Sequence, residues 1–185
     1  MIYLVRHGLD DESYIGGYSE IDLIDIGRES IHDLGEWLKE QDFLIDRIYT
    51  SDVKRAVSTS RIINEYLVLP IIKTSDLREL DKGLLNGMKK KEALLIYPNF
   101  IVVNDINVRY PNGESMLDLY NRIKILLEDI SKYDNSIIVT HRGVINMFYY
   151  ILNNIPLDMD KEKFMVTHGS IHELNLVNKK IRKLR

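Results

Sequence analysis

The sequence predicts an α/β protein in which helices cover both faces of a mainly parallel central sheet, a three-layer α/β/α arrangement. Two observations carry this prediction. Short apolar segments rich in β-forming residues alternate along the chain with longer segments of helical periodicity. The apolar segments have little polar alternation, which is typical of strands buried on both faces. At 185 residues the chain can bury such a core, and we expect one domain over residues 1–185.

The composition argues against several classes of function. The chain has no cysteine, which excludes disulfides, thiolate nucleophiles and zinc clusters of the cysteine type. Its formal net charge of −3 argues against a general nucleic-acid binder. No apolar run reaches the ~18 residues of a membrane span, and the amino terminus lacks the basic start and cleavage site of a signal peptide. We therefore expect a cytoplasmic protein with neither a nucleic-acid nor a membrane partner.

The first predicted strand, Ile2–Val5, runs directly into Arg6, His7 and Gly8. Polar groups at the carboxyl end of a buried strand lie at the edge where open α/β sheets bind their ligands. Arginine suits phosphate oxygens, histidine can act as a base or nucleophile, and glycine lets the backbone approach an anion.

The next two elements predict a second polar group at the same edge. Apolar residues recur at helical spacing from Asp25 to Gln41, and a strand follows at Arg47–Thr50. A helix is predicted from Ser51 to Leu67, which places Arg55 in its first turn. Amide donors and the helix dipole favour an anion there, although Arg55 could equally be a solvated surface residue.

The least regular part of the chain follows a third strand at Ile71–Thr74. Residues 90–97 predict a short helix, but residues 82–114 are otherwise polar and loop-like. Because so long a loop in a compact domain is usually functional, we expect residues 82–114 to form a lid or substrate wall. A capping box of Ser115 and Asp118 then predicts a helix that extends to residue 132.

The clearest strand, Ser136–Thr140, repeats the layout of the first, because it ends in His141, Arg142 and Gly143 before a helix. Two histidines placed identically at strand ends indicate one shared site.

The last part of the chain predicts a pair of strands, and none of its residues is assigned a functional role. Residues 171–177 and 180–184 read as paired strands, the second with a basic edge that discourages strand-to-strand aggregation. His168 and His172 lack partners at metal-ligand spacing and are assigned no role.

Five side chains are therefore expected to converge at one edge of the sheet: Arg6, His7, Arg55, Glu79 and His141. This set suits a phosphate monoester. Cations hold the phosphate oxygens, one histidine attacks, and the carboxylic acid protonates the leaving oxygen.

Five segments, in this order, resemble the motifs of the histidine phosphatase superfamily, also called the phosphoglycerate mutase-like family. They are Leu4-Val5-Arg6-His7-Gly8, Thr50-Ser51-Asp52-Val53-Lys54-Arg55-Ala56, Leu77-Arg78-Glu79 with Gly83 and Gly87, Pro111-Asn112-Gly113-Glu114-Ser115, and Val139-Thr140-His141-Arg142-Gly143. The resemblance covers most of the chain and implies a phosphoglycerate mutase-like fold.

The resemblance also implies a role for each site residue. His7 would be the nucleophile that becomes phosphohistidine, and Glu79 would be the general acid and then the base that activates water. The substrate-binding residues would be Arg6, Gly8, Ser13, Arg55, His141 and Arg142. Neighbouring arginines are expected to lower the pKa of His7, while bound phosphate should favour protonated His141. The scheme needs neither a metal nor a cofactor.

Some positions depart from the family pattern. Leu9-Asp10 stands where the family usually has Glu-Thr, Ser13 stands about where an asparagine often helps bind phosphate, and Asn86 replaces a common glutamate. Arg142 replaces a glycine after the second histidine. It could reach a second anionic group of the substrate or point to solvent.

The short segment between Glu79 and Ser115 favours a hydrolase, since the mutases of the family carry larger insertions. We expect a phosphatase of a small phosphorylated metabolite, as a monomer or homodimer. A sugar phosphate, a phosphoglycerate and α-ribazole phosphate are all candidate substrates. Phosphoglycerate mutase activity is one alternative. A catalytically silent phospho-ligand-binding or regulatory protein is another, although it need not retain all five site residues.

Overall fold

A six-stranded sheet forms the centre of the computed structural model, which describes all 185 residues. Its strands lie in the order β3-β2-β4-β1-β5-β6. The first four strands along the chain are parallel, while β5 and β6 add as antiparallel neighbours, so the mainly parallel sheet is confirmed. The strands are β1 (Ile2–Arg6), β2 (Arg47–Ser51), β3 (Ile71–Thr74), β4 (Ser136–Thr140), β5 (Ile171–Asn175) and β6 (Lys180–Lys183).

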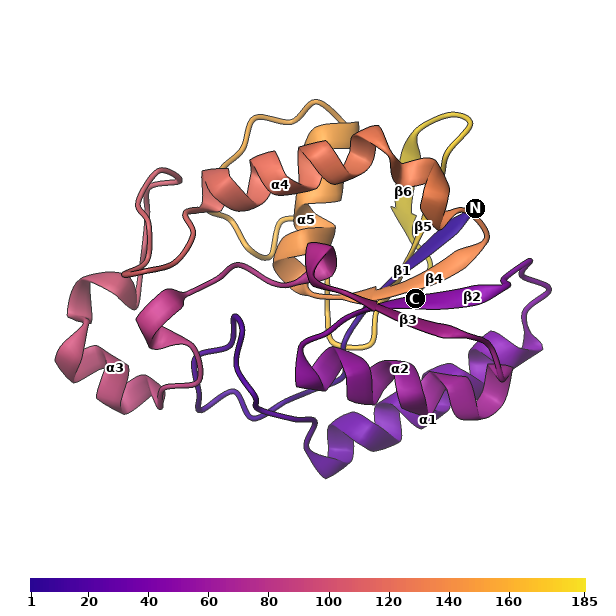
Figure 1. Cartoon of the computed structure of the whole chain (residues 1–185), viewed down its shortest axis with the longest axis horizontal. Coiled ribbons are helices and arrows are strands. Elements are labelled where there is room, and N and C mark those ends of the chain that lie inside the picture. Colours follow the sequence, from indigo (N-terminus) through magenta and orange to yellow (C-terminus); the bar gives the residue numbers. More distant parts are fainter.

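Helices cover both faces of this sheet, which confirms the three-layer prediction (Figure 1). One face carries α1 (Asp25–Glu40) and α2 (Lys54–Leu67), and the other carries α4 (Met116–Glu128) and α5 (Arg142–Leu152). The short helix α3 (Lys90–Ile96) lies away from the sheet. None of the helices has both the length and the apolar character needed to cross a membrane.

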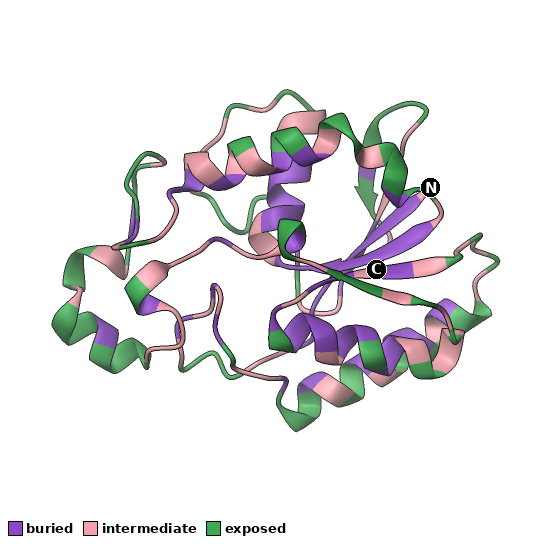
Figure 2. Ribbon diagram, in the orientation of Figure 1, coloured by how far each residue is buried: buried purple, intermediate pink, exposed green.

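The core explains why the central strands read as continuous apolar runs. In β1, Ile2 and Leu4 belong to the hydrophobic cluster under α4 and α5, whereas Tyr3 and Val5 belong to the cluster under α1 and α2. Both sides of the strand are therefore buried, as Figure 2 shows for the centre of the sheet.

Two helix boundaries differ from the prediction. Helix α2 begins at Lys54 rather than Ser51, because Ser51 continues β2 and the Asp52 carboxylate accepts a hydrogen bond from Arg78 Nε (2.6 Å) instead of capping the helix. Helix α4 has the predicted capping box but ends at Glu128. A 3₁₀ turn follows it, as Tyr133 turns into the core.

A buried histidine in β5 makes the stability of this fold depend on pH. His172 is fully buried, with one ring nitrogen 2.9 Å from the Tyr149 hydroxyl and the other 2.9 Å from the Ser170 hydroxyl. Burial, with a smaller effect from Lys183, lowers the pKa of His172 from 6.5 to about 4. The unfolded chain therefore binds the proton first, and the free energy of unfolding should fall as the pH drops from 6.5 to 4.

The free energy of unfolding should fall less in His172→Gln than in the wild type between pH 6.5 and 4, by on the order of 2 kcal/mol, since glutamine does not titrate. The measurement is urea unfolding at a series of pH values over this range. The wild-type protein, unfolded in the same buffers, is the reference for this comparison. Equal slopes for wild type and His172→Gln would contradict the prediction.

Candidate active site

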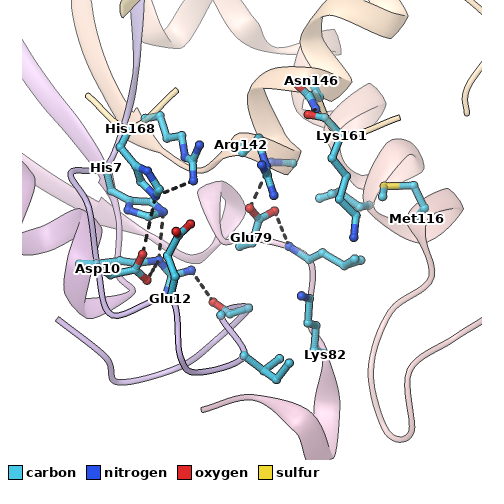
Figure 3. A pocket seen from close by; sticks show the side chains of 18 of the residues that line it. His7, Asp10, Glu12, Glu79, Lys82, Met116, Arg142, Asn146, Lys161 and His168 are labelled. Carbon is cyan, nitrogen blue, oxygen red and sulfur yellow. Dashed lines mark hydrogen bonds and ion pairs between the residues drawn. The ribbon is translucent and has the colours of Figure 1, made fainter. Parts of the chain in front are cut away.

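A pocket with a cavity volume of about 190 Å³ lies at the carboxyl-terminal edge of the parallel strands. Figure 3 shows the side chains that line it, and most of the predicted site residues are among them. The predicted residues on its walls are Arg6, His7, Arg55, Glu79 and Arg142, whereas Gly8, Ser13 and His141 do not line it. The remaining walls come from three loops and from helices α3, α4 and α5. They are formed by Asp10, Asp11, Glu12, Tyr14, Ile15, Gly16, Gly17, Leu80, Lys82, Lys90, Met116, Leu119, Gly143, Asn146, Met147, Asp158, Met159, Asp160, Lys161 and His168.

His7 presents an unprotonated ring nitrogen to this site. Its Nδ1 lies 2.7 Å from the Gly8 carbonyl oxygen, which can only accept, so Nδ1 carries the hydrogen and Nε2 keeps its lone pair. Arg55 Nε donates to that Nε2 at 3.1 Å. Burial lowers the pKa of His7 well below its ordinary value, and Arg55, His141 and Arg6 lower it further. The predicted direction of the shift is confirmed, with burial as the larger cause.

Arg55 is almost fully buried beneath the pocket, and every nitrogen of its guanidinium is occupied. Besides the bond to His7, Nη1 donates to Ser19 Oγ (3.1 Å), and Nη2 donates to the Gly17 carbonyl (2.8 Å) and to His141 Nδ1 (3.2 Å). Gly17 has a φ of +69°, and a side chain there would overlap the amide of Asn86. Glycine is therefore required at position 17 to present its carbonyl to Arg55.

Arg6 reaches the site from the other side of His7. Its Nη1 donates to the Val166 carbonyl (2.7 Å) and its Nη2 to His168 Nε2 (2.6 Å). Its Nε is buried with no hydrogen-bond partner. Burial, followed by the charge of Arg142, lowers the pKa of Arg6 to about 10. An unpaired buried donor in the pocket wall beside His7 indicates a place for an anionic acceptor.

His141 supports Arg55 from behind the pocket rather than lining it. The ring is fully buried, and its centroid lies 5.1 Å from that of His7. Because Nδ1 accepts from Arg55, Nε2 carries the hydrogen and donates to Ser51 Oγ (2.9 Å). Burial, and then Arg55, lowers the pKa of His141 well below its ordinary value, so the ring is neutral in this state. Its protonation by bound phosphate stays a prediction.

Glu79 is fixed in the pocket wall by two backbone donors. Oε1 accepts from Leu80 N (2.9 Å), and Oε2 accepts from Gly143 N (3.1 Å) in the first turn of α5. A side chain at Gly143 would overlap Glu79 Oε1, so this position needs a glycine for the close approach.

The Gly113-Glu114-Ser115 turn explains how the loop that carries Glu79 is held. Arg122 of α4 donates to the Arg78 carbonyl (3.1 Å) and the Glu79 carbonyl (3.2 Å), and its Nε donates to Glu114 Oε1 (2.9 Å). The other Glu114 oxygen accepts from Asp81 N (2.9 Å). Glu114 therefore acts on the site through the backbone on either side of Glu79.

Two predicted substrate-binding residues lie outside the pocket. The Gly8 amide donates to Thr59 Oγ1 (3.0 Å), and a side chain at Gly8 would lie 2.7 Å from Ile31, so Gly8 serves close packing and its N–H is not free for an anion. Ser13 is exposed and lies outside the pocket, in a turn where its amide donates to Asp11 Oδ1 (2.9 Å).

Asp10 and His168 are pocket residues that the sequence did not indicate. Asp10 Oδ2 lies 3.5 Å from Arg55 Nε, and Oδ1 lies 3.7 Å from His168 Nε2. Burial, and then Arg6, lowers the pKa of His168 to about 3. Asp10 is three residues from His7 and could have been considered. His168 comes from a segment without regular structure, where no local pattern marks a site.

Geometry alone could place a metal ion among His7, Asp10 and His168, whose ligand atoms lie within 4.8 Å of one another. The donor set does not fit a cation, however. The Nε2 atoms of both histidines already accept from guanidinium groups, so an ion would have to displace Arg55 and Arg6 and remain beside their charges.

Comparison with known proteins gives a consistent result. The sequence model described as "Histidine phosphatase superfamily (branch 1)" matches residues 2–185. The chain is 36% identical over 151 residues to an uncharacterized phosphatase, PhoE, of Bacillus subtilis (strain 168), covering 78% of this chain and 73% of that one. It is 36% identical over 160 residues to phosphoglycerate mutase-like protein 4 of Arabidopsis thaliana, covering 80% and 69%. It spans only 30% of the 6-phosphofructo-2-kinase/fructose-2,6-bisphosphatases that it also matches.

Solved structures agree on the fold. The crystal structure of a putative α-ribazole-5'-phosphate phosphatase from Escherichia coli superposes with a TM-score of 0.83 at 22% identity, covering 100% of this chain and 95% of that one.

The position of Asp10 predicts a penalty on anion binding. Its carboxylate stands against Arg55 and beside His7, where it repels an incoming phosphate. We expect Asp10→Asn to tighten the binding of inorganic phosphate near pH 7 by roughly tenfold, measured by isothermal titration calorimetry. Asp11→Asn, at the exposed rim of the same pocket, is the control and should change the affinity by about twofold or less. Unchanged or weaker phosphate binding by Asp10→Asn would show that the Asp10 charge does not oppose the ligand.

Proposed function

The chain belongs to the histidine phosphatase superfamily, and from this premise we propose that it hydrolyses the phosphomonoester of a small metabolite through a phosphohistidine on His7. The observation that carries the proposal is the state of His7. Its ring is neutral, its Nε2 carries no hydrogen and accepts a hydrogen bond from Arg55, and two arginines flank it at the wall of a pocket that also contains Glu79. The small cavity suits a metabolite.

In the first step, phosphate draws the Arg55 guanidinium away from His7 Nε2 and onto its own oxygens. Arg6 supports the same oxygens with its unpaired Nε. The freed lone pair attacks phosphorus, a P–N bond forms and the P–O ester bond breaks. Glu79, fixed by Leu80 N and Gly143 N, gives a proton to the leaving oxygen, so that an alcohol departs.

In the second step, water attacks the phosphohistidine. Glu79, now a carboxylate, accepts a proton from that water, the P–N bond breaks, and inorganic phosphate and neutral His7 are restored. Residues 82–114 would act as a partial lid, since Lys82 and Lys90 line the pocket. We propose hydrolysis rather than mutase chemistry because this short segment leaves a phosphorylated enzyme open to water.

Three further expectations from the sequence stay predictions: independence from metal ions, a cytoplasmic location, and a monomer or homodimer. The first is supported by the two guanidinium groups that would have to leave before a cation could bind His7 and His168. Activity assays should therefore succeed in the presence of EDTA. Activity that returns only with added magnesium would contradict this part of the proposal.

We expect His7→Ala to lower turnover of p-nitrophenyl phosphate by on the order of 10⁴-fold or more, because the nucleophile is lost. The measurement combines steady-state kinetics with circular dichroism of the variant. His32→Ala, at a partly exposed position outside the pocket, is the control and should retain full activity. Near-normal turnover in a well-folded His7→Ala protein would remove His7 from the mechanism. A wild-type protein that binds phosphate but turns over no ester would favour a catalytically silent binding protein.

We expect Glu79→Gln to slow the release of poor leaving groups far more than good ones, because an alkoxide needs the proton and a nitrophenolate does not. A loss of roughly 100-fold or more for an alkyl phosphate, with a much smaller loss for p-nitrophenyl phosphate, would fit a general acid. Glu114→Gln is the comparison variant. Because Glu114 holds the loop that carries Glu79, its loss should change the rates of hydrolysis of both substrates by similar factors. Equal losses for both substrates in Glu79→Gln, with phosphorylation rate-limiting, would contradict the assignment.

A further inference from the structure

A second group of cations lies in the same pocket, beyond the nucleophile. Figure 3 shows Lys82, Arg142 and Lys161 around Glu79, with Lys82 and Lys161 on the side of Glu79 away from His7. The charge of Glu79 acts on Arg6 and Arg55 as well as on Lys82 and Lys161. Glu79 therefore separates the phosphate-binding end of the pocket from this basic end.

Three different segments bring this basic group together. Lys82 follows Glu79 in the loop after β3, Arg142 is the first residue of α5, and Lys161 belongs to the segment between α5 and β5. Lys161 is held in place because the buried Asn146 side chain donates to its carbonyl (2.9 Å), and the neighbouring Glu162 pairs with Arg142. Its position in the pocket wall is thus fixed by α5.

The two lysines have no charge partner of their own. Neither ammonium group forms a hydrogen bond or ion pair, although both line the pocket. Burial, and then Lys161, lowers the pKa of Lys82 to about 8, while burial and Arg142 lower the pKa of Lys161. Such mutual repulsion is relieved when an anion binds between the groups.

The acidic residues near this basic group do not cancel it. Asp158 is bonded to the Tyr150 hydroxyl and pairs with Lys163, and Asp160 accepts from the Glu162 amide (3.0 Å). Glu162 pairs with Arg142 and offsets part of its charge, and it also acts on Lys161 but not on Lys82. Glu79 is therefore the only carboxylate that acts on both lysines. Lys90, at the exposed rim, adds a further positive charge.

We propose that Lys82, Arg142 and Lys161 bind a second anionic group of the substrate. The enzyme then prefers phosphomonoesters whose leaving group carries a carboxylate or a second phosphate. The inference rests on the proposed function, because Glu79 must protonate the leaving oxygen and therefore lies between the scissile phosphate and the rest of the substrate. A leaving group that passes Glu79 ends among these three cations.

A matched pair of substrates tests whether the second anionic group is a carboxylate. Glycerol 3-phosphate and 3-phosphoglycerate share a carbon skeleton, and only the second has a carboxylate opposite the phosphate. Fructose 6-phosphate and fructose 1,6-bisphosphate test in the same way whether it is a second phosphate. The wild type should show a higher kcat/KM for the doubly anionic member of at least one pair, by roughly tenfold or more. The pair that shows the preference identifies the class of anion.

Lys161→Gln should reduce this preference by roughly tenfold, mainly through a higher KM. Lys91→Gln, on α3 and outside the pocket, is the control and should preserve the preference. The preference of the wild type for the doubly anionic substrate should also fall as the pH rises above about 8, because Lys82 of the unliganded enzyme then loses its proton.

The outcomes separate the two proposals. If the wild type hydrolyses p-nitrophenyl phosphate and glycerol 3-phosphate but shows no preference in either pair, the second-anion subsite is refuted while the phosphatase stands. A preference that survives unchanged in Lys161→Gln and in Lys82→Gln also refutes it. If no phosphomonoester is hydrolysed, the proposed function itself fails.

Discussion

The guanidinium of Arg55 is the interaction on which the site depends. Its four hydrogen bonds join His7 at the end of β1, His141 at the end of β4, and Ser19 and Gly17 in the loop after β1. The side chain is 2% exposed, so the bonds form in a low-dielectric setting where each is strong and a missing partner is costly. The parallel order of β2, β4 and β1 brings these partners within reach of one arginine in the first turn of α2.

That arrangement also sets the protonation state of the histidines. A guanidinium is a permanent cation, so a buried imidazole beside it stays neutral and offers its lone pair. Burial is the larger cause of the neutral state of His7, and the bond from Arg55, which adds to it, also occupies Nε2. In the proposed mechanism, a ligand that attracts Arg55 therefore exposes Nε2 of His7, so that phosphate binding is coupled to the start of the chemistry.

Sequence reasoning predicted the parts of the fold and site that depend on local pattern. Apolar runs buried on both faces marked the parallel strands, and Arg6, His7, Arg55 and Glu79 were placed correctly because the carboxyl ends of parallel strands share one edge. His168 was missed because the fold, rather than any periodicity, brings it to Arg6 over 162 positions of sequence.

The predicted residues that do not line the pocket are also explained by contacts made in three dimensions. Gly8 looked available to an anion, but its amide donates to the hydroxyl of Thr59 in α2. Ser13 was predicted because it stands about where an asparagine of the family often helps bind phosphate, but here it is exposed, in a turn where its amide donates to Asp11. The basic group of Lys82, Arg142 and Lys161 forms only where three separate segments meet, which no single stretch of sequence can indicate.

The positive charges that lie close together in the pocket affect how well the folded protein resists unfolding. Arg6, Arg55, Lys82 and Lys161 all have lowered pKa values in the empty pocket, which means that the folded chain holds positive charge there at an energetic cost. A bound phosphate ester relieves that cost and stabilises only the folded state. Such a ligand raises the free energy of unfolding as its concentration rises. The supply of the metabolite would therefore govern how much of the protein resists unfolding and degradation.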